Sequence, residues 1–409
     1  MKRTRWAIPE IPEFKAPKPI NWQKWLLILI VISIVGVLVA ISMTYSGIPL
    51  ITGLGIAALP PLFVCLVFFY LQFSYKYNKQ QQHESWEVEK ENIHRKWQQW
   101  AQMYWYVNDY TLILPDNIDI TKIPLIEAVS SGKIRHNFQQ VITPFSFFDT
   151  GKDLFAKRYD KKEIILEKIL FHHLPDLEKI QDLEGENLKI IIVEDKFHSE
   201  KDLINRRLGE NSVDLVIRLL KEQNCQKMPD ILLKNAADFQ PDEIQDWLEK
   251  EKIKHALIIA LSVNSTNANE AACSLLLGKT LIREELIKIR MLRSNSTIKG
   301  NLNEMLEQII QYQLDKQSPL GLWLSNMDSN SQAELIQVLY KHNIDLISLD
   351  SAHSMNNLDM LCGNLIPIQG WINLVSAAKF VGAGKGNQLA ITQIDGRYGT
   401  HFFHSVLDI

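Results

Sequence analysis

Cysteine thiols are the side chains of this sequence best suited to covalent chemistry. The chain contains no CxxC pair and no Cys/His pair, and its cysteines stand far apart: Cys65, Cys225, Cys273 and Cys362. This spacing predicts neither a disulfide framework nor a zinc site, and it fits a reducing compartment. Cys273 and Cys362 are the candidates for a reactive thiol, but a small buried cysteine is the commoner state.

Histidines, which serve as bases and metal ligands, occur in two close pairs. His172 and His173 are adjacent in FHHLP. On a helix they point in different directions, so a helix end is the simplest interpretation. His401 and His404 are three residues apart in THFFHSV, which places them on opposite faces of a strand, where they cannot easily share one ion. We therefore expect no metal site.

Two other kinds of segment could hold a substrate or a phosphate. LDSAHSMNNLD carries Asp350, His353 and Asp359; a hydrolytic Asp/His arrangement is one interpretation, and a solvated loop is the simpler one. The GKT at 278–280 lacks the glycine that a phosphate-binding loop needs five positions earlier, where Cys273 stands. VGAGKGN follows a predicted helix, so it is expected to cap that helix and not to bind an anion. We expect no cofactor.

The bulk composition also limits the function. The formal net charge is -3 and the sequence pI is about 6.4, so the chain lacks the basic field that contacts to nucleic-acid phosphates require. Hydrophobic residues make up 46% of its 409 residues, which is enough for a folded core. We therefore expect a folded protein that binds no nucleic acid.

Two apolar segments predict a helical hairpin in a membrane. Residues 25–45 and 50–73 carry no charged side chain, each is long enough to cross a bilayer, and only SGIP separates them. Small residues such as Gly53 allow the helices to approach closely. Pro60 and Pro61 predict a kink in the second helix.

The charges around the hairpin predict its orientation. Lys and Arg flank both outer ends of the two apolar segments, and the connecting loop has neither. The positive-inside rule then places both termini in the cytoplasm, with two spans in a bacterial inner membrane. A cleaved signal peptide is the alternative, but no small-residue cleavage site follows the first segment.

The chain divides into five predicted segments. They are a Pro-rich cytoplasmic tail (1–23), the transmembrane hairpin (24–74), an amphipathic stalk helix (75–108) and two halves of a larger domain (109–317 and 318–409). The stalk has no Gly or Pro, and its apolar residues recur at helical spacing: Trp86, Ile93, Trp97, Trp100 and Tyr104. Such a stripe usually packs on the chain's own domain, and a partner protein or a membrane surface is the alternative. The tail is expected to be a spacer or a docking strand.

The larger domain reads as alternating strands and helices from about Tyr110, which predicts an α/β fold with a largely parallel sheet. The clearest predicted strands are 188–194, 230–234, 255–262 and 272–278, with later ones in LGLWLSN, DLISLD, QLAITQID and THFFHSVL. The predicted helices are 200–222, 241–251, 302–316, 331–342 and 369–382. The strand–helix–strand order recurs after about residue 318, which suggests two similar halves.

With these elements in place, the domain resembles the thiolase-like, or β-ketoacyl synthase, superfamily of condensing enzymes. CGNLIPIQGWINLVSAAKF resembles that family's loop and buried small-residue helix, and NQLAITQI, DGRYG and THFFHSVL resemble the two strands that follow. DILLKNAADFQPDEIQDWLEKEKIKHALIIALS is similar to the strand, nucleophile helix and strand of the other half, and NEAACSLLLGK resembles the family's GEGAAALVL. The resemblance covers residues 110–409 and implies a layered αβαβα domain behind the transmembrane hairpin.

The resemblance also implies where catalytic residues would stand. Condensing enzymes need a thiolate at the start of the buried helix and two imidazoles, or a His and an Asn, that polarise the thioester. The nucleophile position falls in NAAD (235–238), which has no cysteine. The position of the first His falls in WLSNMDSNS, which offers Ser325, Asn326 and Asp328; the position of the second falls in LCGNLIP, which offers Asn364. We therefore predict a degenerate member without catalytic, cofactor-binding or metal-binding residues.

These predictions favour a membrane-anchored, catalytically inactive scaffold or adaptor. Its expected partners are the lipid bilayer and either another protein or a second copy, because condensing enzymes usually dimerise through strands at the centre of the dimer. In outline it resembles accessory proteins beside bacterial secretion machines that deliver toxins, such as type VI secretion. The alternatives are a membrane-proximal acyltransferase or condensing enzyme that uses Cys362 or Cys273, and a sensor that retains an acyl or nucleotide pocket.

Overall fold

The computed structural model divides the chain into two compact units, which are residues 8–97 and residues 1–7 with 98–409. The described residues are 6, 8, 11–114, 157–183, 187–194, 211–225, 227–263, 270–283, 287–298, 300–314, 320–344, 355–359 and 367–407. Each unit is described by itself below.

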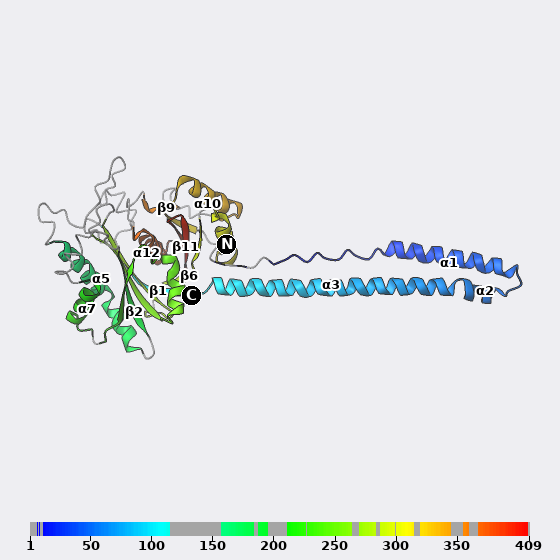
Figure 1. The fold of residues 1–409 in the computed structure, drawn as a ribbon, viewed down its shortest axis with the longest axis horizontal. Coiled ribbons are helices and arrows are strands. Elements are labelled where there is room, and N and C mark those ends of the chain that lie inside the picture. The colour runs from blue at the N-terminus through cyan, green and yellow to red at the C-terminus, as the bar shows by residue number, and fades with distance from the viewer. Residues whose placement is uncertain are drawn as a thin grey trace. The chain divides into compact units, whose positions relative to one another are not determined.

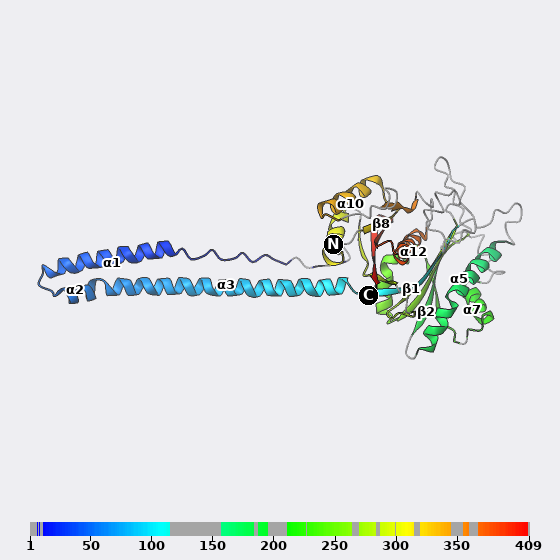
Figure 2. The same cartoon turned by 180° about the vertical axis from the view of Figure 1, so that it is seen from behind.

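The first unit is a helical hairpin with an extended tail. Its helices are α1 (Trp22–Thr44), α2 (Leu50–Ala57) and α3 (Leu59–Ala101), and α1 lies beside the start of α3 in both views (Figures 1 and 2). Helix α1 and the apolar part of the α2–α3 segment are long and apolar enough to cross a membrane. The predicted kink is instead a break at Ala58, and Pro60 and Pro61 occupy the first turn of α3, where a missing N–H costs nothing.

Small residues bring α1 and α2 together. Gly36 faces Ala58 so closely that an added Cβ would lie 2.8 Å from the Ala58 Cβ, and a Cβ on Gly53 would lie 3.3 Å from the Ala40 carbonyl oxygen. The chain segments can approach this closely only because one residue in each contact is a glycine, which has no side chain.

The tail packs along α3 and is more than a spacer. The Trp86 indole N–H donates to the Pro12 carbonyl at 2.9 Å, the Phe14 ring lies 6.3 Å from the Trp86 ring, and Lys76 donates to the Pro19 carbonyl at 3.2 Å. At least one aromatic residue of the predicted stalk stripe thus packs on the chain itself.

The second unit contains one large sheet. Its described strands are β1 (Tyr104–Ile113), β2 (Leu188–Glu194), β3 (Asp230–Asn235), β4 (His255–Ser262), β5 (Ala271–Gly278), β6 (Ile287–Leu292), β7 (Asn295–Ile298), β8 (Leu320–Ser325), β9 (Met355–Asn357), β10 (Asn387–Ile394) and β11 (Arg397–Leu407). The strand order is β3-β2-β4-β5-β1-β6-β11-β10-β8-β9, and β7 pairs with β11. The predicted strands are confirmed, except that 345–350 lies outside the described residues.

The sheet is mixed, so the prediction of a largely parallel sheet is wrong. Strands β2, β3 and β4 are mutually parallel, as are β8, β9 and β10, but β5, β1, β6 and β11 all pair antiparallel with their neighbours. Strands β4–β5 and β10–β11 run in opposite directions because each follows its predecessor directly and not through a crossover helix.

The strand order repeats, as the sequence suggested. The set β1 to β5 has the spatial order 3-2-4-5-1, and β6, β8, β9, β10 and β11 repeat that order. Strands β1 and β6 pair antiparallel and join the two sets. The repeat thus begins at β6, and the boundary after residue 317 remains a prediction about domains.

Helices cover both halves of the sheet. They are α5 (Lys157–Asp182), α7 (Ser212–Glu222), η1 (Pro241–Glu243), α8 (Ile244–Lys250), α9 (Leu302–Tyr312), α10 (Ser329–Lys341) and α12 (Gln369–Gly382). α5 and α7 bury their apolar faces against the first half of the sheet (Figure 1). α9 and α10 pack together beside β7 and β11 of the second half.

Helix α12 forms the centre of the core. Every residue of this helix except Lys379 and Gly382 is buried, and it contacts β6, β8, β10 and β11 of its own half together with β1 and β5 of the other. The Asn373 amide donates to the carbonyls of Trp323 and Ile391, at 3.2 and 3.1 Å, and so ties the helix to β8 and β10. A helix without a polar face is stable only inside such a core.

The predicted stalk helix ends earlier than expected. Helix α3 stops at Ala101, although the stalk helix was predicted to continue to residue 108. Strand β1 begins at Tyr104, the last residue of the aromatic stripe. Trp105 and Val107 are buried in the sheet core, and residues 104–107 pair with β6. Pairing and burial outweigh the helical spacing of the aromatic residues.

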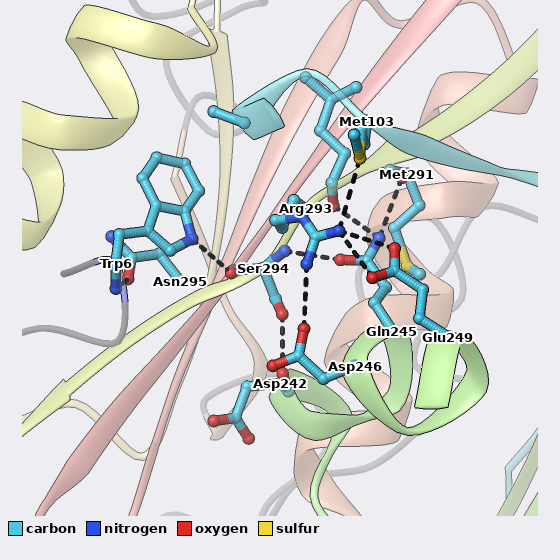
Figure 3. A network of polar contacts seen from close by, with 12 residues as sticks. Trp6, Met103, Asp242, Gln245, Asp246, Glu249, Met291, Arg293, Ser294 and Asn295 are labelled. Atoms are coloured by element: carbon cyan, nitrogen blue, oxygen red, sulfur yellow. Dashed lines mark hydrogen bonds and ion pairs between the residues drawn. The ribbon is translucent and has the colours of Figure 1, made fainter. Parts of the chain in front are cut away.

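A polar network joins the N-terminus, the end of α3 and the domain (Figure 3). The Trp6 side chain is 1% exposed, donates to the Ser294 carbonyl at 2.9 Å and meets the Trp100 ring edge-on at 5.6 Å. Arg293 lies 4.5 Å from the same Trp100 ring and forms ion pairs with Asp246 and Glu249 at 3.0 and 2.7 Å. Both ends of the hairpin segment are thus attached to one place on the domain.

We predict that Arg293→Ala destabilises the domain, because the side chain is only 7% exposed and its loss leaves Asp246 and Glu249 without this partner. Both carboxylates stay partly solvated, so we expect a loss of about 2 kcal/mol, below the value for a fully buried pair. Lys341→Ala, which removes an exposed pair with Glu307, should cost less than about 1 kcal/mol. Urea unfolding of the detergent-solubilised chain measures both; equal losses would contradict the role of Arg293.

Candidate functional site

The predicted nucleophile position is a turn between β3 and η1. The Asn235 side-chain amide donates to the Asp238 carboxylate at 2.9 Å, and the Phe239 N–H donates to the Asn235 carbonyl at 3.0 Å. Ala236 is completely buried. The groups at this turn are therefore amide, methyl and carboxylate, and none of them is a nucleophile suited to acyl transfer.

The loops of the second half meet on one carboxylate. Asn326, which follows β8 and has a positive φ of 59°, donates its N–H to Asp359 at 2.6 Å and its side-chain amide to the Gln393 carbonyl at 3.0 Å. Gln369, at the start of α12, also donates to Asp359. Burial raises the pKa of Asp359, and the two donors oppose that shift. Asp359 thus positions loops and does not stand beside a histidine among the described residues.

Aromatic side chains from the segment before η1, from α8 and from α12 pack against one another. The Phe239 ring stacks on the Trp371 ring at 5.8 Å and meets the Trp247 ring edge-on at 5.8 Å. Phe239 and Trp371 are 5% and 1% exposed. A Cβ on Gly370 would lie 3.1 Å from Pro241, so the starts of α12 and η1 are in close contact. Among the described residues, Phe239, Trp247 and Trp371 therefore pack together beside this contact.

A surface hollow of about 380 Å³ lies on the outer side of this packing. It is lined by Asp242, Glu243, Asp246, Trp247, Lys250, Ser296 and Arg397. Its lining is mostly charged, which does not suit an apolar acyl group.

Comparison with known proteins supports the fold. No protein-family model matches the sequence, and no curated protein matches it. Among solved structures, a type II PKS acyl-carrier protein in complex with its ketosynthase bound to the hexaketide matches 74% of this chain and 99% of that chain, with a TM-score of 0.51 and 14% identity.

This chain has a thiolase-like fold. Weaker similarities are to 3-oxoacyl-[acyl-carrier-protein] synthase III from Aquifex aeolicus VF5 (TM-score 0.41, 12% identity, 73% of this chain and 99% of that chain) and to the peroxisomal 3-ketoacyl-CoA thiolase of Saccharomyces cerevisiae (TM-score 0.41, 8% identity, 60% and 90%). The predicted fold class and resemblance are therefore confirmed at the level of the fold.

The thiolase-like domain holds Cys273 where it cannot react readily. Cys273 lies on β5, is 1% exposed and belongs to the central core. Burial raises the pKa of its thiol far above the ordinary value, and a backbone contact to Ala260 offsets only part of that shift. Cys225 and Cys65 are also buried. Cys362 and Asn364 lie outside the described residues, as do Asp350 and His353.

The glycine-rich segments have structural roles in the described residues. Gly278 ends β5, where a Cβ would lie 2.5 Å from the Asn108 amide and 2.6 Å from a ring nitrogen of His255. The segment after α12 has positive φ at Gly384 and Gly386, and the N–H groups of Ala383, Gly384 and Lys385 donate to carbonyls in the last turn of the helix. This is the predicted C-terminal cap. His404 bonds to Asn387 at 3.0 Å, and His401 is buried on the opposite face of β11.

The interpretation of His172 and His173 as a simple helix end is wrong. Both rings approach one oxygen of Asp109 on β1, with ring nitrogens 3.0 and 3.3 Å away. Burial raises the pKa of Asp109, but the two imidazoles lower it by more, so its net pKa lies below the ordinary range. The contact raises the pKa of His172, and burial lowers that of His173. Sequence reasoning missed this cluster because Asp109 comes from a distant strand.

Proposed function

We propose that this protein is a membrane-anchored scaffold or adaptor whose thiolase-like domain has lost catalytic activity. The observation that carries the proposal is the packing of Phe239 on Trp371 beside a turn, 235–238, that contains no sulfur atom. Covalent acyl transfer needs a thiolate and preorganised donors for the oxyanion, and each missing donor costs several kcal/mol of transition-state stabilisation. The packed aromatic rings, and the lack of a thiol at the turn 235–238, support an interaction role.

Inactivity predicts that the protein takes up no acyl group. Incubation of the solubilised chain with an acyl-CoA, or with an acylated acyl-carrier protein, should leave its intact mass unchanged, because the Cys273 thiol is buried. An adduct that disappears in Cys362→Ala but persists in Cys273→Ala would instead support the alternative, a membrane-proximal acyltransferase that uses Cys362. Cys225→Ala serves as the matched control.

The proposal that the protein is anchored in a membrane rests on the positions of its charged residues and on the course of the chain. Lys and Arg flank the apolar helices, and Asn21 caps the start of α1, where its side chain accepts the Lys24 N–H at 3.1 Å. A two-helix hairpin returns the chain to the side from which it started, which agrees with the attachment of Trp6 to the same domain that follows α3. We therefore propose a bacterial inner-membrane protein with both termini cytoplasmic.

This topology is tested by cysteine labelling. We expect Ser46→Cys, in the short loop of the hairpin, to react with a membrane-impermeant maleimide in spheroplasts. Glu89→Cys, exposed on α3, should react only after permeabilisation. Both cysteines are placed at exposed positions, so the opposite pattern would reverse the orientation, and labelling of both would exclude the hairpin.

The edge of the sheet at β3, as formed by the described strands, supports an interaction role. Strand β3 ends the order of the described strands and pairs there with β2 alone. Leu233 on this strand is 46% exposed. Exposed edges with apolar residues invite pairing with another strand. A second copy of the chain is the occupant that we propose, in line with the dimers of condensing enzymes.

Leu233→Lys should weaken this self-association, because two copies paired through β3 would bring like charges together. We expect the wild type to be a dimer by light scattering in detergent, and the variant to shift toward the monomer. Tyr340→Lys on α10, where the native side chain is 84% exposed, should remain a dimer.

If the wild type is a monomer by light scattering, the proposed dimer is wrong. If pull-down from solubilised membranes then also returned no stoichiometric protein, the scaffold role itself would fail. The same pull-down tests the finer proposal that the partner belongs to a toxin-delivering secretion machine such as type VI secretion.

A further inference from the structure

Three donor atoms converge on the first half of the sheet, on the face covered by α5. They are Asp109 Oδ2 from β1 and, from α5, His172 Nε2 and His173 Nδ1, and all lie within 4.8 Å of one another. The two imidazole nitrogens lie 3.0 and 3.3 Å from the same carboxylate oxygen. Helix α12 packs in a different hydrophobic cluster from α5, together with Phe239 and Trp371. The Asp109–His172–His173 group is therefore separate from the predicted nucleophile position.

The two separations between an imidazole nitrogen and the Asp109 oxygen match those of neighbouring ligands on a metal ion. Bonds of about 2.0–2.2 Å to a divalent ion, at tetrahedral or octahedral angles, place adjacent ligand atoms about 3.0–3.5 Å apart. Imidazole nitrogen with one carboxylate oxygen is a donor set typical of zinc and similar borderline ions.

The direction of the His173 ring favours an ion over a hydrogen bond. His173 is fully buried, and its Nδ1 makes no hydrogen bond within the described structure although Asp109 Oδ2 is 3.3 Å away. The oxygen therefore lies off the axis of the ring nitrogen. Two ligands that share an ion have this arrangement, because each points at the ion and not at the other. A buried imidazole nitrogen without a partner is otherwise costly.

Outer hydrogen bonds hold two of the three side chains, His173 and Asp109, in place. His173 Nε2 bonds to Ser274 Oγ at 2.7 Å, which fixes the ring, and the Tyr110 N–H donates to the other Asp109 oxygen at 2.8 Å. The register of β1 on β5 shifts between Val107 and Asp109, so the regular pairing of β1 is interrupted next to the carboxylate. Such second contacts commonly accompany metal ligands.

We propose that Asp109, His172 and His173 bind one divalent transition-metal ion, of which Zn²⁺ is the test case. The side chain of His172 is 41% exposed, so the ion is reached from solvent and water completes its coordination. Bound there, the ion fastens α5 to β1 and stiffens the outer layer of the first half of the domain. This role is independent of the proposed scaffold function.

The test uses the full chain, purified in detergent without a histidine tag, stripped with EDTA and incubated with Zn²⁺ alone. We expect one Zn²⁺ per wild-type chain after desalting. His172→Ala should bind Zn²⁺ about tenfold or more weakly, and its partly exposed position makes it the variant that folds most readily. His342→Ala removes a histidine beside a single carboxylate, Glu307, and should bind Zn²⁺ like the wild type.

A second measurement replaces Zn²⁺ with Co²⁺. The wild type should show the visible absorption of four-coordinate cobalt, and Asp109→Asn should lose it while its circular dichroism stays unchanged. Absence of both stoichiometric Zn²⁺ and the cobalt absorption in the wild type would overturn the site. Equal Zn²⁺ binding by the wild type and His172→Ala would do so as well, and the cluster would then be an ion pair.

Discussion

The burial of α12 between the two halves of the sheet is the constraint on which the domain depends. The helix presents Trp371, Asn373 and the small residues that follow to strands of both halves, so neither half has a complete core without it. Burial of this much apolar surface is the main source of stability in a domain of this size. The fold persists because this packing is intact, whether or not any chemistry takes place at the ends of the helix.

The same packing holds the thiolase-like fold together independently of any chemistry at its site. Catalysis needs a cavity and reactive groups held in unfavourable conformations or environments. Both normally lower the free energy of unfolding. Here the start of α12 touches Pro241, and Phe239 lies between Trp247 and Trp371. These aromatic contacts therefore hold the starts of η1 and α12 together. Fold and function are separable in this way because function belongs to the site and not to the architecture.

The N-terminal segment and the last turn of α3 meet at one place on the domain. Trp6 and Trp100 meet beside Arg293, so the chain leaves the domain and returns to it at one place. Between these points the tail packs on α3 through Trp86, which gives the long helix a second contact along part of its length. Tryptophan supplies these contacts because its ring buries a large area and its N–H still finds an acceptor.

The sequence alone determined the elements whose pattern is local. The apolar runs of the hairpin, the strands at 188–194 and 255–262 and the helix at 369–382 follow from periodicity and length, and the family resemblance followed from their order. Tertiary structure decided what depends on distant neighbours. It ended α3 at Ala101 because Trp105 is buried in the sheet, made the sheet mixed, and brought Asp109 to His172 and His173. Local patterns carry no information on which strand lies beside a given helix. The cluster of Asp109, His172 and His173 could therefore not be predicted from the spacing of residues in the sequence.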